Sequence, residues 1–511
     1  MRRICRVLFS RYAISAVLIL VEVVLFGLLI FSMPKSIYAF IAVSAVVAVL
    51  ALVNLINKDT NPEYKISWAV VILTVPCFGA LLYLLFYKRV ISKREAKMLR
   101  EVISKLMGEG DADEDFVTLS EDSALAAGKA RALVLDYPIA GVYRSSQSSY
   151  ISSGEEYFER LISDIEGAEK YIFLEYFIID EGEVWSKIHG ILKKKAEEGV
   201  DVRVLYDDIG CMKTLPARYE LTLRREGIVA YRFARVNPRV SSVHHNRDHR
   251  KICVVDGRVA YTGGVNIADE YVNKITRFGH WKDGGIRIEG LAVAGFVKLF
   301  LSSYDVTAGV ESDYAEMLSS VKAPDNSDGG YYIPFGSGPA PIYKRPVGKN
   351  VFLNIINQAE RYVYITTPYL IIDYDLTEAL RNAALRGVDV RIVTPGVADK
   401  RGVKVMTKSS YPYLLEAGVK IFEYTPGFIH EKLMVSDGLY AVIGTINLDF
   451  RSLVHHYECA VWMYRTSAVA EAYDGFIKTL ESCTEIDREK AKLTPLEWMY
   501  RNGIRLFAPL L

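Results

Sequence analysis

Two histidines and two lysines recur in this chain in a pattern that could carry out phosphoryl-group chemistry. One residue separates His249 from Lys251, and one residue separates His430 from Lys432. Each copy continues with an aspartate and then an asparagine, which stands 17 positions after the histidine in both copies. These further motif residues are Asp256, Gly263, Gly264 and Asn266 in the first copy, and Asp437, Gly444, Thr445 and Asn447 in the second. A nucleophilic imidazole, a fixed cation and an amide donor, present twice, suit transfer of a phosphodiester through a covalent intermediate.

Each copy of the motif is predicted to form a strand, a tight turn and a returning strand. Side chains alternate along a strand, so the histidine and the lysine of one copy should lie on the same face. The turns are predicted at residues 256–257 and 437–438, because Asp-Gly between apolar runs is a strong hairpin signal. The returning strand brings the asparagine back beside the histidine and lysine, where both can bind phosphate oxygens. A single copy is ordinary for a solvated strand, but two copies with matched spacing argue against a purely structural role.

The rest of the chain repeats as well, which predicts two homologous α/β domains built from a mixed sheet flanked by helices. The similar segments are 169–180 with 360–373 and 197–208 with 385–396, with helical stretches between them at 184–199 and 376–387. A period of about 190 residues is too long for a solenoid and suits two fused domains. Neither half carries a complete acid–base pair, so one site is expected at the interface between the halves, with one histidine from each.

Three apolar segments near the N-terminus are each long enough to cross a bilayer, at residues 12–32, 37–57 and 66–87. The predicted order is a hydrophobic segment at 1–35, a transmembrane hairpin at 36–90, a basic helix with an acidic linker at 91–135, a first domain at 136–320, a linker at 321–340, and a second domain with a tail at 341–511. Within this order, residues 91–107 form either a basic amphipathic helix on an anionic bilayer or a solvated linker helix. The acidic residues 108–116 are expected to be flexible, and the tail at 493–511 is expected to rest on the membrane.

The basic residues that flank the apolar region conflict with three spans. Four arginines lie near the N-terminus, at positions 2, 3, 6 and 11, and Lys88, Arg89, Lys93 and Arg94 follow the third segment. Both ends therefore favour the cytoplasm, whereas three spans would place them on opposite sides. The second and third segments make the better hairpin, joined by polar residues 57–65. The first segment contains Glu22 and is left open, as a span, a shallow segment or a partner for another chain.

The paired motifs resemble those of the phospholipase D superfamily, and their contexts at 244–271 and 424–453 are similar to bacterial cardiolipin synthases over nearly the full length. The resemblance implies a ping-pong transfer, in which one histidine attacks the lipid phosphorus and the other protonates the leaving alcohol. Related enzymes usually attack with the first motif, so the resemblance implies that His249 is the nucleophile and His430 the general acid. The sequence itself does not distinguish the two histidines. Lys251 and Lys432 would neutralise phosphate charge, and Asn266 and Asn447 would donate hydrogen bonds to it.

Carboxylates are expected to orient the catalytic histidines by binding their second ring nitrogen. In the resembled family a glutamate on a later strand has this role. Glu458 lies on such a strand, and Asp283 occupies the equivalent place in the first half. Either residue could instead be an ordinary surface carboxylate. The motif aspartates Asp256 and Asp437 sit at turns and are expected to hold their loops together.

The resemblance implies an enzyme that joins two phosphatidylglycerol molecules into cardiolipin and releases glycerol, in the cell membrane and with its catalytic domains in the cytoplasm. A hydrolytic phospholipase D, a nuclease of the same superfamily and an inactive membrane scaffold are the alternatives. None of the eight histidines has zinc-ligand spacing, so no metal and no other cofactor is expected. The adjacent histidines at 455 and 456 are expected to form hydrogen bonds near the site. With a net charge of +1, no nucleic-acid partner is expected, while anionic lipids are, and homo-oligomerisation stays open.

Overall fold

The computed structural model describes Val24 and residues 34–87, 93–107, 113–235, 246–339 and 343–506. The chain divides into two compact units. The first, called here the N-terminal unit, comprises Met1–Ile91, Val236–His245 and Met499–Leu511. The second, called here the α/β body, comprises Ser92–Arg235 and Asn246–Trp498.

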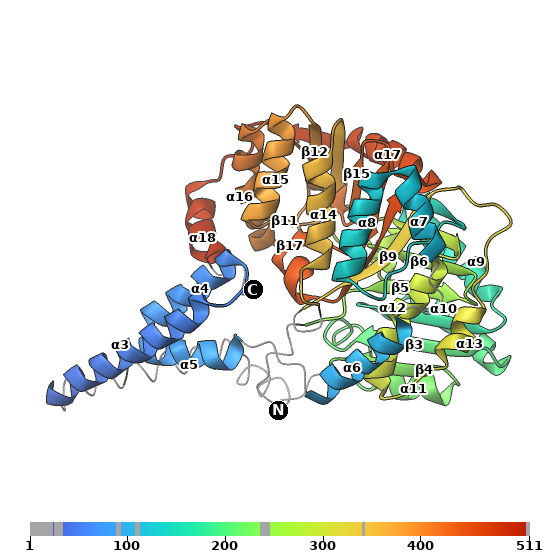
Figure 1. The fold of residues 1–511 in the computed structure, drawn as a ribbon, viewed down its shortest axis with the longest axis horizontal. Coiled ribbons are helices and arrows are strands. Elements are labelled where there is room, and N and C mark those ends of the chain that lie inside the picture. The colour runs from blue at the N-terminus through green and yellow to red at the C-terminus, as the bar shows by residue number, and fades with distance from the viewer. Residues whose placement is uncertain are drawn as a thin grey trace. The chain divides into compact units, whose positions relative to one another are not determined.

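The first half of the α/β body is built on a mixed seven-stranded sheet (Figure 1). The order is β1 (Ser146–Ile151), β8 (Gly285–Gly290), β6 (Val259–Gly263), β5 (Lys251–Val255), β2 (Tyr171–Tyr176), β3 (Asp201–Asp207) and β4 (Val229–Phe233). β2, β3 and β4 run parallel, whereas β5, β6, β8 and β1 pair antiparallel. The associated helices are α9 (Gly154–Glu166), α10 (Glu183–Glu197), α11 (Tyr219–Arg225), α12 (Val293–Ala308) and α13 (Tyr314–Ser319).

The second half repeats this plan in an eight-stranded sheet, coloured orange to red in Figure 1 apart from the yellow β9. The order is β19 (Cys483–Ile486), β13 (Lys420–Tyr424), β12 (Asp389–Pro395), β10 (Tyr362–Thr366), β15 (Leu433–Ser436), β16 (Tyr440–Gly444), β18 (Glu458–Tyr464) and β9 (Tyr331–Ser337). The helices are α14 (Val347–Gln358), α15 (Tyr374–Leu385), α16 (Arg401–Glu416) and α17 (Ser467–Leu480). The units β2–α10–β3 and β10–α15–β12 correspond to the repeated segments of the sequence, so the predicted duplicated fold is confirmed.

A single large hydrophobic core joins the two halves. Phe173 on β2, Phe300 on α12 and Val442 on β16 all belong to it and are buried. A second core lies mainly in the first half, where Leu161 of α9 and Ile188 of α10 are both fully buried, and it also includes Phe428 of the second half. α12 therefore contributes to a core shared by both sheets, whereas α9 and α10 cover a face of the first sheet alone.

Both predicted motif hairpins are present, and their turns match the Asp-Gly signal. Asp256 and Gly257 have φ values of 56° and 65°, and Asp437 and Gly438 have values of 58° and 71°. Two consecutive left-handed residues give the twist that a two-residue hairpin needs, and Asp and Gly adopt this region more readily than most residues. In each turn the chain closes with a backbone hydrogen bond, from Arg258 to Val255 and from Leu439 to Ser436.

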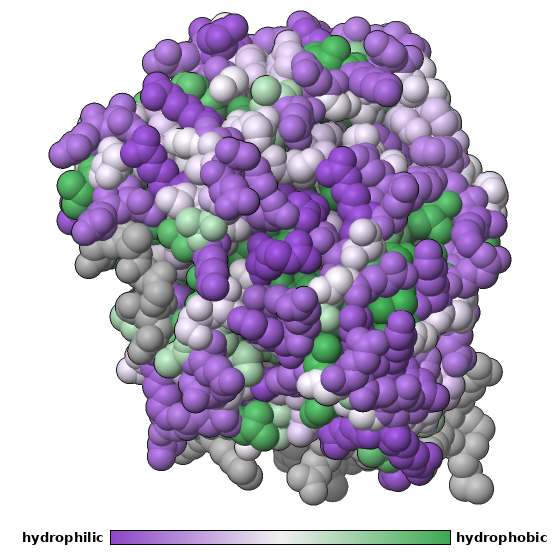
Figure 2. Space-filling model, turned by 90° about the vertical axis from the view of Figure 1, so that its right-hand side faces the viewer, coloured by the Kyte–Doolittle hydropathy of each residue, from purple (hydrophilic) through white to green (hydrophobic). Residues whose placement is uncertain are grey.

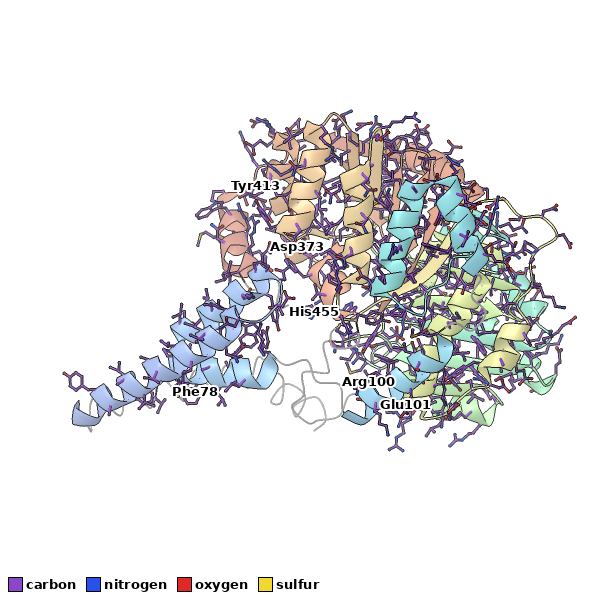
Figure 3. The ribbon with its side chains drawn as sticks, in the orientation of Figure 1. Phe78, Arg100, Glu101, Asp373, Tyr413 and His455 are labelled. Atoms are coloured by element: carbon purple, nitrogen blue, oxygen red, sulfur yellow. The ribbon has the colours of Figure 1, made fainter. Side chains whose placement is uncertain are left out.

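Two stretches of the body differ from the sequence predictions, and for a third the structure favours one of the two alternatives. The acidic stretch continues into helix α7 (Asp113–Asp122), because Leu119 is fully buried in the core and acidic residues favour a helix start. The expected linker at 321–340 contains β9, which forms an edge of the second sheet. Helix α6 (Lys93–Leu106) buries Val102 and Leu106 in the body core, while Arg100 and Glu101, labelled in Figure 3, are exposed. The apolar face of α6 thus packs against protein, which favours the linker-helix alternative.

The N-terminal unit contains α3 (Pro34–Ile56), which is long and apolar enough, over Tyr38–Ile56, to cross a membrane. This agrees with the span predicted at 37–57. The span predicted at 66–87 is wrong as a continuous helix, because the chain forms α4 (Pro62–Thr74) and α5 (Pro76–Phe86) with a break between them. The segment predicted at 12–32 lies outside the described residues, except for Val24. The face of the molecule shown in Figure 2 is mostly hydrophilic, with isolated apolar residues.

Candidate active site

A short parallel ladder between the two halves positions His430. β14 (Gly427–Ile429) of the second half pairs with β7 (His280–Lys282) of the first half, with Ile429 opposite Lys282. The next residues on each chain are His430 and Asp283. The His430 backbone N–H donates to Lys282 O at 2.7 Å, and its Nδ1 lies 2.7 Å from Asp283 Oδ2. The carboxylate that holds His430 therefore comes from the other half of the body.

The same arrangement recurs at His249 with the halves exchanged. A parallel bridge joins Asp248 to Tyr457, and the His249 backbone N–H donates to Tyr457 O at 2.8 Å. His249 Nδ1 lies 2.9 Å from both carboxylate oxygens of Glu458, the first residue of β18. Each histidine thus has Nδ1 against a fully buried carboxylate, which leaves its Nε2 for a ligand.

The histidines lie just before the motif strands and not on them, which differs from the prediction. β5 begins at Lys251 and β15 at Leu433. The reason is the cross-half pairing, because the backbone at each histidine bonds to the opposite half instead of to its own sheet. The lysines still converge with the histidines, since Lys251 Nζ donates to His249 O at 2.6 Å and Lys432 Nζ donates to His430 O.

The motif aspartates lie away from the histidines and brace the hairpins. The Asp256 carboxylate accepts backbone N–H bonds from Glu169, Lys170 and Tyr171, at 2.7 to 2.9 Å. Asp437 accepts the equivalent bonds from residues 360–362, at 2.8 to 3.0 Å. Each carboxylate ties the motif turn to the start of the neighbouring central strand, β2 or β10.

The two motif asparagines differ in their contacts, although both are buried. Asn266 Oδ1 accepts the Ile178 N–H at 3.1 Å, and its Nδ2 donates to the Tyr271 hydroxyl at 2.5 Å. Asn447 Oδ1 has no hydrogen-bond partner among the described residues. The sequence predicted the same role for both asparagines and could not anticipate this difference, because it depends on Tyr271.

The residue that follows Gly263 in the first copy and Gly444 in the second fits the carboxylate of its own half. At Gly264, a Cβ would lie 2.0 Å from Asp283 Oδ1, so a side chain there would displace the carboxylate. At the equivalent position of the second half, Thr445 donates a hydrogen bond to Glu458 Oε2. Gly264 leaves room for the aspartate, whereas Thr445 supports the longer glutamate. The sequence shows both residues in the motif but does not show which carboxylate each one meets.

The enclosed positive charge shifts the ionisation of the site. Burial lowers the pKa of Lys432 to about 7 and that of Lys251 to about 8, and for Lys432 the charge of Lys251 adds to the effect. Burial and the two lysines lower the pKa of His249 well below its usual value. Burial and Lys432 lower the pKa of His430 to about 4, although the nearby Asp283 carboxylate opposes that shift.

The two carboxylates respond differently to burial. Burial raises the pKa of Glu458 to about 7. At Asp283, the effect of burial is outweighed by His430 and Lys432, and the pKa lies below its usual value. Asp283 is therefore ionised beside His430 at neutral pH, while Glu458 is close to its titration midpoint. Little negative charge accompanies the two lysines and two histidines of the site. This imbalance favours binding of a phosphate group.

A third histidine, His456, lies beside His249 and Glu458. The rings of His249 and His456 are 5.6 Å apart, and His456 Nδ1 is 3.8 Å from Glu458 Oε1. The ligand atoms of His249, His456 and Glu458 all lie within 4.8 Å of one another, so the three could hold a metal ion. No spacing in the sequence indicated this cluster, because His249 belongs to the other half. His455, labelled in Figure 3, belongs to the π-helix Arg451–His455 that precedes His456 and Glu458.

The family profile described as "Cardiolipin synthase, PLD-like domain" matches residues 161–276 and 352–480, one match in each half. The profile "Phospholipase_D-nuclease N-terminal" matches residues 46–86. A cardiolipin synthase of a Geobacillus strain is 33% identical over 473 residues, which is 91% of this chain and 92% of that protein. The chain belongs to the cardiolipin synthase family of phospholipase-D-like proteins.

Other relatives cover the same extent. A cardiolipin synthase of Halalkalibacterium halodurans is 32% identical over 93% of this chain and 94% of its own length. A Streptococcus mutans protein of unassigned function is 40% identical over 90% of this chain and 99% of its own length. The crystal structure of a phosphatidylserine synthase from Haemophilus influenzae superposes with a TM-score of 0.56, at 15% identity, over 75% of this chain and 98% of that one. That likeness shows the shared fold.

Proposed function

We propose that the protein is a cardiolipin synthase that transfers a phosphatidyl group between two phosphatidylglycerol molecules and releases glycerol. The observation that carries this proposal is the crossed pairing of two buried histidines with two buried carboxylates, beside two converging lysines. The family supports the choice of lipid, because full-length relatives are named cardiolipin synthases. Asn266 and Asn447 are proposed to hold the phosphate together with Lys251 and Lys432.

In the first step, His249 Nε2 attacks the phosphorus and the P–O bond to the glycerol headgroup breaks. His430 gives its proton to the departing oxygen, which leaves as glycerol and a phosphatidyl-His249 intermediate. In the second step, the hydroxyl of another phosphatidylglycerol attacks this phosphorus and loses its proton to His430. The P–N bond breaks, cardiolipin forms and His249 is restored. The second step is thus the same type of reaction as the first run in reverse, with His430 as the base instead of the acid.

The unequal electrostatics of the two histidines support this assignment. Asp283 is ionised 2.7 Å from His430 and opposes the lowering of the His430 pKa, which suits the ring that must carry a proton once the phosphate is bound. The carboxylate beside His249 opposes the fall of its pKa less, because the raised pKa of Glu458 leaves that group only partly ionised at neutral pH, and a neutral ring suits a nucleophile. The phosphate of the substrate adds negative charge and raises the pKa of both rings when it binds.

Trapping of the intermediate tests both the reaction and the roles. His430→Ala is expected to accumulate an acid-labile phosphatidyl adduct from labelled phosphatidylglycerol but to form little cardiolipin, whereas His249→Ala forms no adduct. Peptide mass mapping should place the adduct on His249. An adduct on His430 in the His249→Ala protein would reverse the roles. Free phosphatidic acid as the main product of the unmodified enzyme would make it a hydrolase.

A further inference from the structure

α4 and α5 are each too short to cross a bilayer. They contain 13 and 11 residues, separated at Val75 and Pro76. At a rise of 1.5 Å per residue, a helix of 13 residues is about 20 Å long, whereas the hydrocarbon core is about 30 Å thick. One straight helix over this segment would cross the membrane, so the geometry of the break decides the topology.

The chain reverses direction at the break. Val75 has φ −134° and ψ 74°, which is not helical, and Pro76 cannot continue the hydrogen bonding of α4 because it lacks an N–H. A Cβ on Gly79 would lie 2.3 Å from Val71 O. Eight residues of continuous helix rise about 12 Å, so only a sharp reversal brings Gly79 against Val71.

The far ends of the two helices also meet. The rings of Tyr64 and Tyr87 are 5.6 Å apart, and those of Trp68 and Tyr83 are 5.7 Å apart. The hydroxyls of Thr60 and Tyr87 lie 3.3 Å apart. In a continuous helix, residues 60 and 87 would be about 40 Å apart. α4 and α5 are therefore antiparallel, with the start of one beside the end of the other.

The open end of this hairpin lies at the C-terminal end of α3. Tyr83 donates its hydroxyl to Asn54 Oδ1 at 2.8 Å, and Lys65 Nζ donates to Ile56 O at 2.9 Å. Near the C-terminus of the chain, Leu506 O accepts the Ser67 hydroxyl at 2.6 Å. The end of α3, both ends of the hairpin and the residue after α18 (Pro495–Arg505) thus lie together at one side of the N-terminal unit.

The outer surface of the hairpin is apolar. Leu73, Leu81 and Leu84 are 61%, 41% and 64% exposed, while Trp68 and Ile72 pack inward. Phe78, labelled in Figure 3, lies on α5 near the break. At the break, Val75 N–H donates to Val71 O and the Thr74 hydroxyl donates to Val70 O, so part of the backbone polarity is already satisfied. A surface of exposed leucines, over a backbone whose polar groups are hydrogen-bonded, is more stable among lipid acyl chains than in water.

We propose that α4 and α5 form a re-entrant hairpin, which enters one leaflet and returns to the side from which it came. This topology removes the charge conflict of the sequence. If residues 12–32 and α3 both span, the basic residues before position 12 and those after position 87 lie on the same side, as the positive-inside rule favours. The α/β body follows the hairpin in sequence and lies on that side too.

Cross-linking in native membranes tests the hairpin directly. In the full-length protein with its six native cysteines replaced, Thr60→Cys and Tyr87→Cys should be joined by a short bis-maleimide. The matched control pair, Thr60→Cys with Thr74→Cys, should not be joined, because these positions lie at opposite ends of α4. The product is read by mass spectrometry as two tryptic peptides linked across Lys65. Absence of the 60–87 product in protein that still forms cardiolipin overturns the hairpin.

Sidedness provides the second measurement. Single cysteines at Asp59, in the turn before α4, and at Glu95, on α6, are both exposed. A membrane-impermeant maleimide should label both from the cytoplasmic side in inverted vesicles and neither in intact spheroplasts. Leu73→Cys should stay unlabelled from both sides, because it lies near the hairpin tip. Labelling of Asp59→Cys from outside with Glu95→Cys labelled only from inside would show a spanning segment instead. These readouts do not depend on which lipid the enzyme uses.

Discussion

At the scale of single residues, the site depends on charges that are buried together. Lys251 and Lys432 approach each other and the two histidines. Among the described residues, neither lysine forms an ion pair with a carboxylate. The lysines are therefore poised to exchange protons near neutral pH, and a bound phosphate restores their full charge. This makes substrate affinity sensitive to pH in a range where isolated lysines do not titrate.

The pH dependence follows from the sign of these shifts. Below pH 7 Lys432 is charged and can attract the phosphate of the proposed substrate. As the pH rises through about 7 the free enzyme loses this proton, with Lys251 following near 8. On this alkaline limb, the kcat/KM for phosphatidylglycerol is expected to fall by up to roughly tenfold per pH unit between the two pKa values and more steeply above the second. Lys432→Arg keeps its charge and should move the limb to higher pH. A Lys432→Arg profile that superimposes on that of the unmodified enzyme contradicts this origin.

At the scale of elements, each motif hairpin is fixed by one carboxylate at its turn. Asp256 and Asp437 occupy the same place in the two halves and accept three backbone N–H bonds each. Their side chains reach from the turn to the neighbouring central strand. The lysine of each motif lies at or next to the start of the first hairpin strand, and the turn lies at the far end of the same strand. By fixing the turn, the aspartate therefore helps to fix the position of the lysine.

Substitution at the turn separates bracing from chemistry. Asp256→Ala loses all three acceptor contacts and is expected to lower the free energy of unfolding by about 2 kcal/mol. Asp256→Asn keeps an acceptor oxygen and tolerates the left-handed backbone, so it should lose less than half as much. Both variants should retain the phosphatidyl-enzyme intermediate once folded, as measured by trapping at low temperature. A stable Asp256→Asn protein that forms no adduct would instead give Asp256 a part in the reaction.

At the scale of the α/β body, the shared core makes one folding unit of two homologous halves. Phe300 of α12 stacks on Phe173 of the first sheet, with ring centroids 4.6 Å apart. The same helix packs against the second sheet, because a Cβ on Gly295 would lie 2.8 Å from Pro334 of β9. The halves therefore cannot separate without exposing a buried face of α12.

Truncation of Phe300 tests this cooperativity. Phe300→Ala leaves a cavity in the shared core and is expected to cost about 3–5 kcal/mol, which lowers the Tm by several degrees. The body should still unfold in a single calorimetric transition, since both sheets lose the same contacts. Phe300→Leu should lose much less. Two resolved transitions, with only the first half destabilised, would show that the halves fold independently.

The sequence alone determined the features that depend on local pattern. The duplicated motifs, the Asp-Gly hairpins and the repeated strand–helix–strand segments are set by residue types at short spacing, and short-range periodicity specifies such elements. The bracing aspartates were also predictable, because a carboxylate at a turn meets nearby backbone N–H groups. The apolar helix α3 follows from composition in the same way.

Only the tertiary structure decided which groups meet across the chain. His249 and Glu458 are 209 positions apart, and the parallel ladder that brings Asp283 to His430 joins the two halves, so no local pattern encodes either pairing. Hydropathy over residues 66–87 likewise sums the apolar residues of α4 and α5 without regard to direction. The reversal at Pro76 depends on packing of Gly79 against Val71 and of Tyr64 against Tyr87, and such contacts exist only once the chain has folded.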